Sequence, residues 1–179
     1  GATGSVGQAL LAEVVACSSF SRIVVMTRRP LDMKSGAAVE EHLVPAMDPA
    51  SLEQAVVDAL QGHAGDATGF SVLGVGAGTA KMSIEQHRAI DVGLNAAFAR
   101  GLRASGKVSH LAFMSAVGAD ATARTTGSGA AGIPRYARVK GEAEAAVLSQ
   151  GPVVVSIFRP AMIIGSQHTP GALAAALSL

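Results

Sequence analysis

Short apolar runs alternate with amphipathic stretches along the whole chain. The runs are typical of buried strands and lie at about 22–27, 42–47, 70–75, 110–115 and 153–158. Between them, apolar residues at helical spacing predict helices over about 6–18, 48–60, 83–104 and 136–150. Pro45 lies inside the second run and is typical of an edge strand, whereas Pro49 suits the first turn of a helix. Because strands and helices alternate, we expect a parallel sheet with right-handed crossovers.

The first seven residues read Gly-Ala-Thr-Gly-Ser-Val-Gly and stand directly before a predicted helix. Glycines let the backbone adopt positive φ and approach a bulky ligand closely. The free N–H groups and the dipole at the start of the following helix favour a pyrophosphate. The combination is typical of a dinucleotide-binding turn and predicts an α/β fold of the Rossmann type, a doubly wound three-layer α/β/α sheet.

In such a sheet the glycine turn follows a strand, yet no apolar run precedes Gly1. We therefore expect the first strand to be missing here, which would leave an empty slot between two apolar strands at the centre of the sheet. An Ala/Leu helical pattern at 171–179 runs to the last residue. Residues 1–179 are thus expected to be one Rossmann domain that is truncated at both ends.

Composition narrows the class of protein. The 179 residues are 49% hydrophobic and 15% charged, which suits a single domain with a substantial core. The net charge is only +1 and the basic residues are dispersed, so nucleic acid is not an expected partner. No apolar run approaches the ~20 residues that cross a bilayer. With Cys17 as its single cysteine, the chain has no internal disulfide, and a soluble, cytoplasmic protein is expected.

The end of the apolar run at 22–27 indicates which nicotinamide cofactor is preferred. An acid at this place favours NAD, whereas an arginine favours the 2′-phosphate of NADP. The chain has Thr27-Arg28-Arg29 and no acid before Asp32, so NADP is the preferred interpretation and NAD is the less favoured one. A solvated basic turn is the alternative for the two arginines. Asp48, after the apolar run at 42–47, is either an adenine contact or the N-cap of the next helix.

Tyr136, the only tyrosine, and Lys140 are four residues apart on a predicted helix, so they share one face. A nearby ammonium group stabilises a phenolate, and such a pair can exchange a proton with a carbonyl or alcohol oxygen. Ser115 ends the preceding strand at the edge where these sheets bind ligands, and its hydroxyl could hold the substrate oxygen. The alternative is a packing role for Tyr136 and a capping role for Ser115.

The sequence gives little support for a metal site, a serine hydrolase or an NTPase. The histidines are scattered without ligand spacing, so no metal site is expected; they are His42, His63, His87, His110 and His168. Ser115 lacks the Gly-x-Ser-x-Gly elbow of hydrolases. The second glycine turn, at 76–79, is not followed by Gly-Lys-Ser/Thr, which excludes a phosphate-binding NTPase loop.

The motifs, in their order along nearly the whole chain, resemble the short-chain dehydrogenase/reductase superfamily in its atypical and extended branch. They are the glycine turn, Thr27-Arg28-Arg29, Ser115, Tyr136-x-x-x-Lys140-Gly-Glu and Phe158-Arg159-Pro160. Within that branch the chain is most similar to the Tat-interacting-protein-like and NmrA-like NAD(P)-binding proteins. The segments that carry this closer similarity are Ser115-Ala-Val-Gly-Ala-Asp120 and Val139-Lys-Gly-Glu-Ala-Glu144.

The resemblance implies catalysis by Ser115, Tyr136 and Lys140, with hydride passing to or from the nicotinamide. It also implies that 74–78 lies along the cofactor and 160–163 beside the nicotinamide. Asp91 and Asn95 are taken as structural residues, although either could support a proton relay. The cofactor-binding residues predicted from motif and resemblance together are Gly1, Thr3, Gly4, Ser5, Val6, Gly7, Arg28, Arg29, Asp48, Gly74, Val75, Gly76, Tyr136, Lys140, Pro160, Met162 and Ile163.

The preferred interpretation is an NADP-dependent oxidoreductase that acts on a small carbonyl or alcohol substrate. One alternative is a non-catalytic NADP(H)-binding regulator or redox sensor with a protein partner, which the loop between Ser115 and Tyr136 and the short C-terminus favour. That loop holds a small-residue insertion at 125–132. A nucleotide-sugar epimerase or dehydratase is the third, and would need a larger C-terminal lobe. Because dimers built on the helices that begin at Ser83 and Tyr136 are common in the superfamily, a homodimer is an alternative to a monomer.

Overall fold

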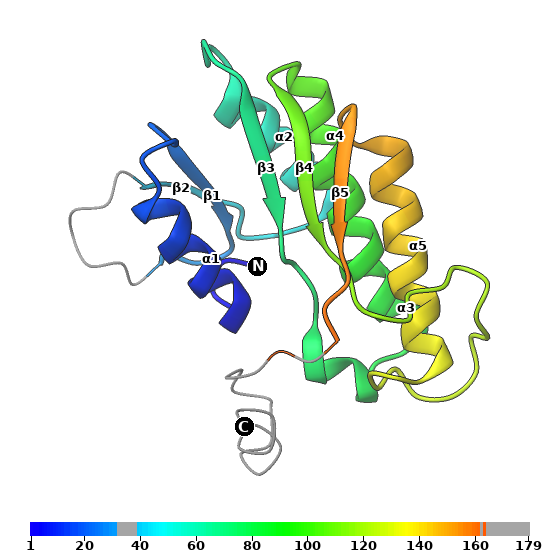
Figure 1. Cartoon of the computed structure of the whole chain (residues 1–179). Coiled ribbons are helices and arrows are strands. Elements are labelled where there is room, and N and C mark those ends of the chain that lie inside the picture. The colour runs from blue at the N-terminus through cyan, green and yellow to red at the C-terminus, as the bar shows by residue number, and fades with distance from the viewer. Residues whose placement is uncertain (32–38, 162, 164–179) are drawn as a thin grey trace.

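The computed structural model describes residues 1–31, 39–161 and 163. The strands of these residues form two parallel sheets (Figure 1). In one sheet β1 (Ile23–Thr27) pairs with β2 (Val39–Leu43). In the other, β4 (Val108–Met114) lies between β3 (Ala67–Ser71) and β5 (Val154–Phe158). The predicted α/β class with parallel strands is confirmed.

Helices follow the strands in alternation, as expected. They are α1 (Ser5–Ala16), α2 (Pro49–Leu60), α3 (Ile84–Arg88), α4 (Asn95–Ser105) and α5 (Pro134–Gln150). Between α3 and α4 the helix continues as a π-helical segment, η2 (Ala89–Leu94), so the predicted helix at 83–104 is present but contains a wider turn. A 3₁₀ helix, η1 (Gly76–Lys81), occupies the second glycine turn. The helix expected at 171–179 lies outside the described residues. No described helix has the length and apolar character to cross a membrane.

Two strands are displaced from their predicted positions. The strand expected at 42–47 is β2, Val39–Leu43, because pairing with β1 fixes it rather than the local apolar run. The Glu40 carboxylate lies on this edge strand, and its oxygens accept hydrogen bonds of 2.6 and 2.8 Å from Arg22. The strand expected at 70–75 is β3, Ala67–Ser71. Beyond it, side chains bind the backbone: the Leu73 carbonyl accepts a 3.2 Å hydrogen bond from Asn95, and the Val75 N–H donates one of 3.1 Å to a carboxylate on η2.

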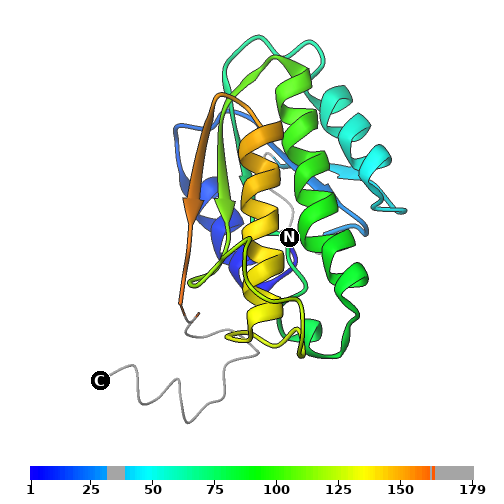
Figure 2. The ribbon, with the colours of Figure 1, turned by 90° about the vertical axis from the view of Figure 1, so that its right-hand side faces the viewer.

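The hydrophobic core lies against the three-stranded sheet. Its buried members come from α2, η2, α4, β4 and α5, and they are Leu52, Val56, Leu94, Ala99, Leu102, Val108, Leu111, Phe113, Ala143 and Val147. Helices α4 and α5 cover one face of this sheet (Figure 2). In contrast, α1 buries only Gly7. The N-terminal part of the chain therefore contributes little to the core.

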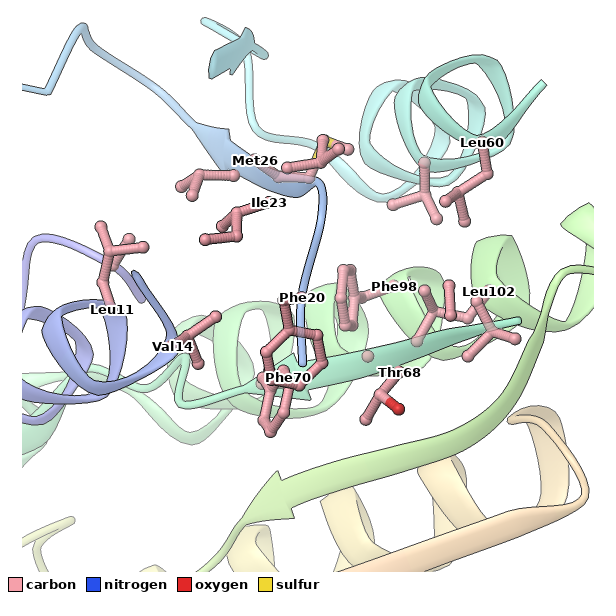
Figure 3. A pocket seen from close by; sticks show the side chains of 18 of the residues that line it. Leu11, Val14, Phe20, Ile23, Met26, Leu60, Thr68, Phe70, Phe98 and Leu102 are labelled. Atoms are coloured by element: carbon pink, nitrogen blue, oxygen red, sulfur yellow. The ribbon is translucent and has the colours of Figure 1, made fainter. Parts of the chain in front are cut away.

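Among the described residues, no strand pairing joins β1 to β3. A cavity of about 520 Å³ lies between them, bordered by residues of both strands and of α1, α2 and α4 (Figure 3). The empty slot that the sequence predicts at the centre of the sheet is therefore present.

Candidate active site

The first glycine turn lies beside the end of β3. A Cβ added to Gly1 would come within 2.6 Å of the Val72 carbonyl carbon, and one added to Gly7 within 2.0 Å of the Gly1 oxygen. Only glycine fits at these two positions. Helix α1 begins at Ser5 with Gly4 as its N-cap, and no side chain accepts a hydrogen bond from its first N–H groups. These donors are thus available for a phosphate, and the turn fits the pyrophosphate of a dinucleotide.

Arg28 and Arg29 directly follow the last residue of β1. Both are exposed, and neither forms an ion pair with any residue that the structure describes. Thr27 is buried, and its hydroxyl donates a 2.8 Å hydrogen bond to the Arg29 carbonyl, which fixes the backbone of the turn. Five other arginines already pair with carboxylates: Arg22, Arg88, Arg100, Arg138 and Arg159. The two guanidinium groups of the turn are therefore free of the carboxylate partners that engage these five.

Asp48 is the N-cap of α2. Its Oδ1 accepts a 3.0 Å hydrogen bond from the Ser51 N–H and its Oδ2 a 2.5 Å bond from the Ser51 hydroxyl. These bonds from Ser51 lower the pKa of the carboxyl group. The capping alternative for Asp48 is confirmed, and its contact with an adenine stays a prediction.

Asp91 links the second glycine turn to helix α5. Its Oδ2 accepts a 3.1 Å hydrogen bond from the Val75 N–H, and its Oδ1 lies 2.6 Å from Lys140 Nζ. A Cβ added to Gly74 would stand 3.2 Å from both Asp91 Oδ1 and Lys140 Nζ, so the glycine leaves room for this pair. Asp91 lies in the π-helical segment, a feature that is frequent at functional sites.

The Asp91–Lys140 pair is almost completely shielded from solvent, with side chains 1% and 7% exposed. His87, fully buried one turn before Asp91, places its Nε2 3.6 Å from Asp91 Oδ1. Burial by itself would raise the pKa of Asp91, but the neighbouring His87 and Lys140 side chains outweigh it, and the net pKa is lowered. Asp91 is therefore a buried carboxylate with a cationic partner.

Tyr136 lies over this cluster, in the first turn of α5. Its ring centroid is 5.8 Å from Lys140 Nζ and 5.8 Å from the centroid of the His87 ring. The structure thus brings Tyr136 and Lys140 together on one face of the helix, as their spacing predicts.

Ser115 follows β4 at the same edge of the sheet, and its N–H donates a 2.7 Å hydrogen bond to the Phe158 carbonyl. Its buried hydroxyl makes no hydrogen bond within 3.5 Å to the described residues. It lies near Glu144, two helical turns beyond Tyr136 on α5. Burial acts to raise the pKa of Glu144, but Arg159, with Ser115 assisting, lowers it overall. Ser115 is therefore placed at the predicted edge, beside the Glu144–Arg159 ion pair.

The remaining predicted positions lie past β5. The Pro160 carbonyl accepts a 2.9 Å hydrogen bond from the Val117 N–H, which holds this segment next to the one that follows Ser115. Ile163 is exposed. Met162 lies outside the described residues.

Two residues of the site, Asp91 and His87, are not among the catalytic residues predicted from the sequence. Both belong to the buried group around Lys140. Their four-residue spacing on one predicted helix was the available signal. Their proximity to Lys140, 49 residues further along the chain, depends on the tertiary fold.

No protein-family model matches the sequence, and no curated protein matches it. Several solved structures are similar to the chain. A short-chain dehydrogenase from Burkholderia cenocepacia J2315 in complex with NADP is 15% identical, with a TM-score of 0.66 over 100% of this chain and 82% of that one. WbmG from Bordetella bronchiseptica, in complex with NAD and UDP, is 16% identical, with a TM-score of 0.67 over 98% of this chain and 56% of that one.

MoeE5 in complex with UDP-glucose and NAD is 21% identical, with a TM-score of 0.62 over 89% of this chain and 52% of that one. The chain thus spans little more than half the length of MoeE5 and of WbmG. At these identities the similarity shows the fold. The chain has a Rossmann fold like that of the Burkholderia short-chain dehydrogenase, of WbmG and of MoeE5, as its motifs predict.

Proposed function

We propose that the chain is the nucleotide-binding part of an NADP-dependent oxidoreductase that interconverts a carbonyl compound and an alcohol. The observation that carries the proposal is the buried Asp91–Lys140 pair beneath Tyr136. It joins the second glycine turn to the helix that bears the proposed proton donor.

In the reducing direction, the bound nicotinamide would supply the hydride to the carbonyl carbon. Tyr136 donates its phenolic proton to the carbonyl oxygen, so the substrate leaves as the alcohol. Lys140 stabilises the resulting phenolate through its positive charge. Asp91 gives the buried ammonium group a counter-charge and fixes its position. Ser115 orients the substrate oxygen.

NADP is favoured over NAD by the turn after β1. Arg28 and Arg29 present two guanidinium groups that pair with no described carboxylate, which suits a 2′-phosphate. No acid stands between Thr27 and Pro30 to bind the ribose hydroxyls of NAD. Similar structures bind either cofactor, NADP in the Burkholderia dehydrogenase and NAD in MoeE5.

The test measures NADPH oxidation against a panel of aldehydes, ketones and quinones, with NADH in parallel. Tyr136→Phe removes only the phenolic oxygen, so it should strongly lower turnover. NADPH binding, followed by fluorescence titration, should be retained. General acid catalysis contributes about 10²–10⁴-fold, and the rate should fall by that factor. Tight NADPH binding with no turnover by either protein would contradict the reductase and favour the regulator.

A nucleotide-sugar epimerase or dehydratase is the second candidate, favoured by the similarity to MoeE5 with UDP-glucose and to WbmG with UDP. An epimerase would convert a UDP-sugar without net oxidation of the cofactor. Incubation with UDP-glucose, followed by chromatography of the sugar products, separates the two functions.

A further inference from the structure

Three polar side chains meet where β4, β5 and α5 lie side by side (Figure 1). Ser115 directly follows β4, Arg159 directly follows β5, and Glu144 lies on α5. In the parallel register of the two strands Met114 is opposite Phe158, so the next residues, Ser115 and Arg159, are neighbours. The 2.7 Å hydrogen bond from the Ser115 N–H to the Phe158 carbonyl fixes this arrangement.

The Ser115 hydroxyl lies beside a buried carboxylate without binding it. The hydroxyl is buried and makes no hydrogen bond with the residues that the structure describes. The neighbouring carboxylate is that of Glu144, whose side chain is only 7% exposed. An ionised carboxylate is a strong acceptor, to which a nearby hydroxyl ordinarily donates its proton. A separate feature must therefore keep the Ser115 proton from Glu144.

Arg159 engages the carboxylate that would otherwise bind this proton. Its Nε donates a 2.8 Å hydrogen bond to Glu144 Oε1, and its Nη2 donates one of 2.5 Å to Oε2. Both carboxylate oxygens are thus bound in a bidentate, charge-assisted pair, the strongest kind of hydrogen bond that side chains form. The positive charge of the guanidinium group makes both oxygens weaker acceptors for a third donor.

We propose that Arg159 is a positioning residue that acts through Glu144: it occupies both carboxylate oxygens and so keeps the Ser115 hydroxyl proton free for a substrate oxygen. Without the guanidinium group, the buried carboxylate accepts a hydrogen bond from Ser115, and the hydroxyl is lost to the substrate. The role in substrate binding rests on the proposed function, whereas the competition for the hydroxyl proton does not.

The test is a double-mutant cycle measured by urea unfolding at pH 7. In the parent chain, Ser115→Ala removes a hydroxyl without a partner, so it should not raise the unfolding equilibrium constant. In Arg159→Met it removes a donor to a buried carboxylate, so the constant should rise by at least about tenfold. Arg159→Lys, which has a point charge in place of the planar fork, is the second background and is used if Arg159→Met does not fold.

Arg88→Met is the matched control for loss of an arginine from α5. Arg88 binds Glu142 of this helix with two hydrogen bonds of 2.7 and 2.6 Å, just as Arg159 binds Glu144. Ser115→Ala should have the same effect in Arg88→Met as in the parent chain. An equal effect of Ser115→Ala in all backgrounds would overturn the proposal.

Turnover gives a second readout if the parent chain reduces a carbonyl compound with NADPH. Ser115→Ala and Arg159→Met should each lower kcat by at least about tenfold, and the double variant should be no slower than the slower single variant. Losses that multiply would overturn the proposal, because the two residues would then act independently. A parent chain without turnover would contradict the proposed function, while the urea cycle would still decide whether Glu144 and Arg159 control the Ser115 proton.

Discussion

Asp91 is the residue that connects the elements of the candidate site. Its two oxygens bind the Val75 N–H and Lys140 Nζ, and its pKa is lowered in the folded protein. A carboxyl group with a lowered folded-state pKa stabilises the fold at pH values above its unfolded pKa, about 3.9. This contribution is lost as the pH falls through the folded-state pKa.

Asp91→Asn keeps an oxygen for the Val75 N–H and removes the charge that pairs with Lys140. A buried ammonium group without its partner should lower the free energy of unfolding at pH 7 by about 3–5 kcal/mol. The variant and the parent chain should converge as the pH falls through the folded-state pKa of Asp91, which lies below its ordinary value, because Asp91 then becomes protonated. Urea unfolding at several pH values measures both effects.

Glu13→Gln on the exposed face of α1 is the control for loss of an acidic charge, and it should follow the parent profile. A constant offset between Asp91→Asn and the parent chain down to the lowest pH would show that the charge of Asp91 does not stabilise the fold.

At the scale of elements, α5 depends on a glycine in its interior. Gly141 is buried, and an added Cβ would stand 2.1 Å from the Ala121 nitrogen and 2.4 Å from the Asp120 carbonyl carbon. The Asp120 N–H donates a 2.9 Å hydrogen bond to the Ala137 carbonyl, so this loop backbone packs directly on the helix. The small residue is needed for that contact.

Gly141→Ala should therefore destabilise the protein by about 1–3 kcal/mol through overpacking, against a helix-propensity gain of about 1 kcal/mol. Gly93→Ala is the matched control, because its added Cβ would meet nothing closer than 3.7 Å. In thermal unfolding, Gly141→Ala should lower the melting temperature and Gly93→Ala should raise it. A stabilised Gly141→Ala chain would mean that the loop moves away from α5 at little cost.

The elements themselves could largely be predicted from sequence. Asp48-Pro49 predicted the start of α2 correctly, and the helix predicted from about Ser83 begins with α3, with Ser83 as its N-cap. The positions of other elements depend on pairing between segments far apart in the sequence. β2 contains Glu40 and Glu41, so no apolar run marked its true position, and only pairing with β1 defines it. The π-helical turn around Asp91 has no local sequence signal of its own.

The candidate site was predictable where its residues share an element and not where they meet across the fold. Tyr136 and Lys140 lie on one helix, and their spacing was sufficient. The Asp91–Lys140 pair spans two helices, and the position of Ser115 next to Glu144 depends on how β4 packs beside α5. Neither of these two contacts can be predicted without the tertiary structure.

The core is unevenly distributed along the chain, and this affects how the whole molecule unfolds. Every buried member of the core cluster against the three-stranded sheet lies at or beyond Leu52, whereas α1, β1 and β2 all precede Asp48. The buried residues Val25 and Val44 of the N-terminal part lie outside this cluster. We expect this N-terminal part to unfold in a separate step of lower free energy, while α2 and all that follows stay folded.

Limited proteolysis should then degrade the chain as far as about Pro49 and leave a resistant remainder, identified by mass spectrometry. That remainder would retain the Asp91–Lys140 pair but not the first glycine turn. Uniform digestion, with no fragment that begins near α2, would show that the molecule opens as one cooperative unit. If the N-terminal part unfolds separately, the dinucleotide-binding turn is the part of the site that unfolds most readily. A bound cofactor would then protect the protein against proteases chiefly at its N-terminus.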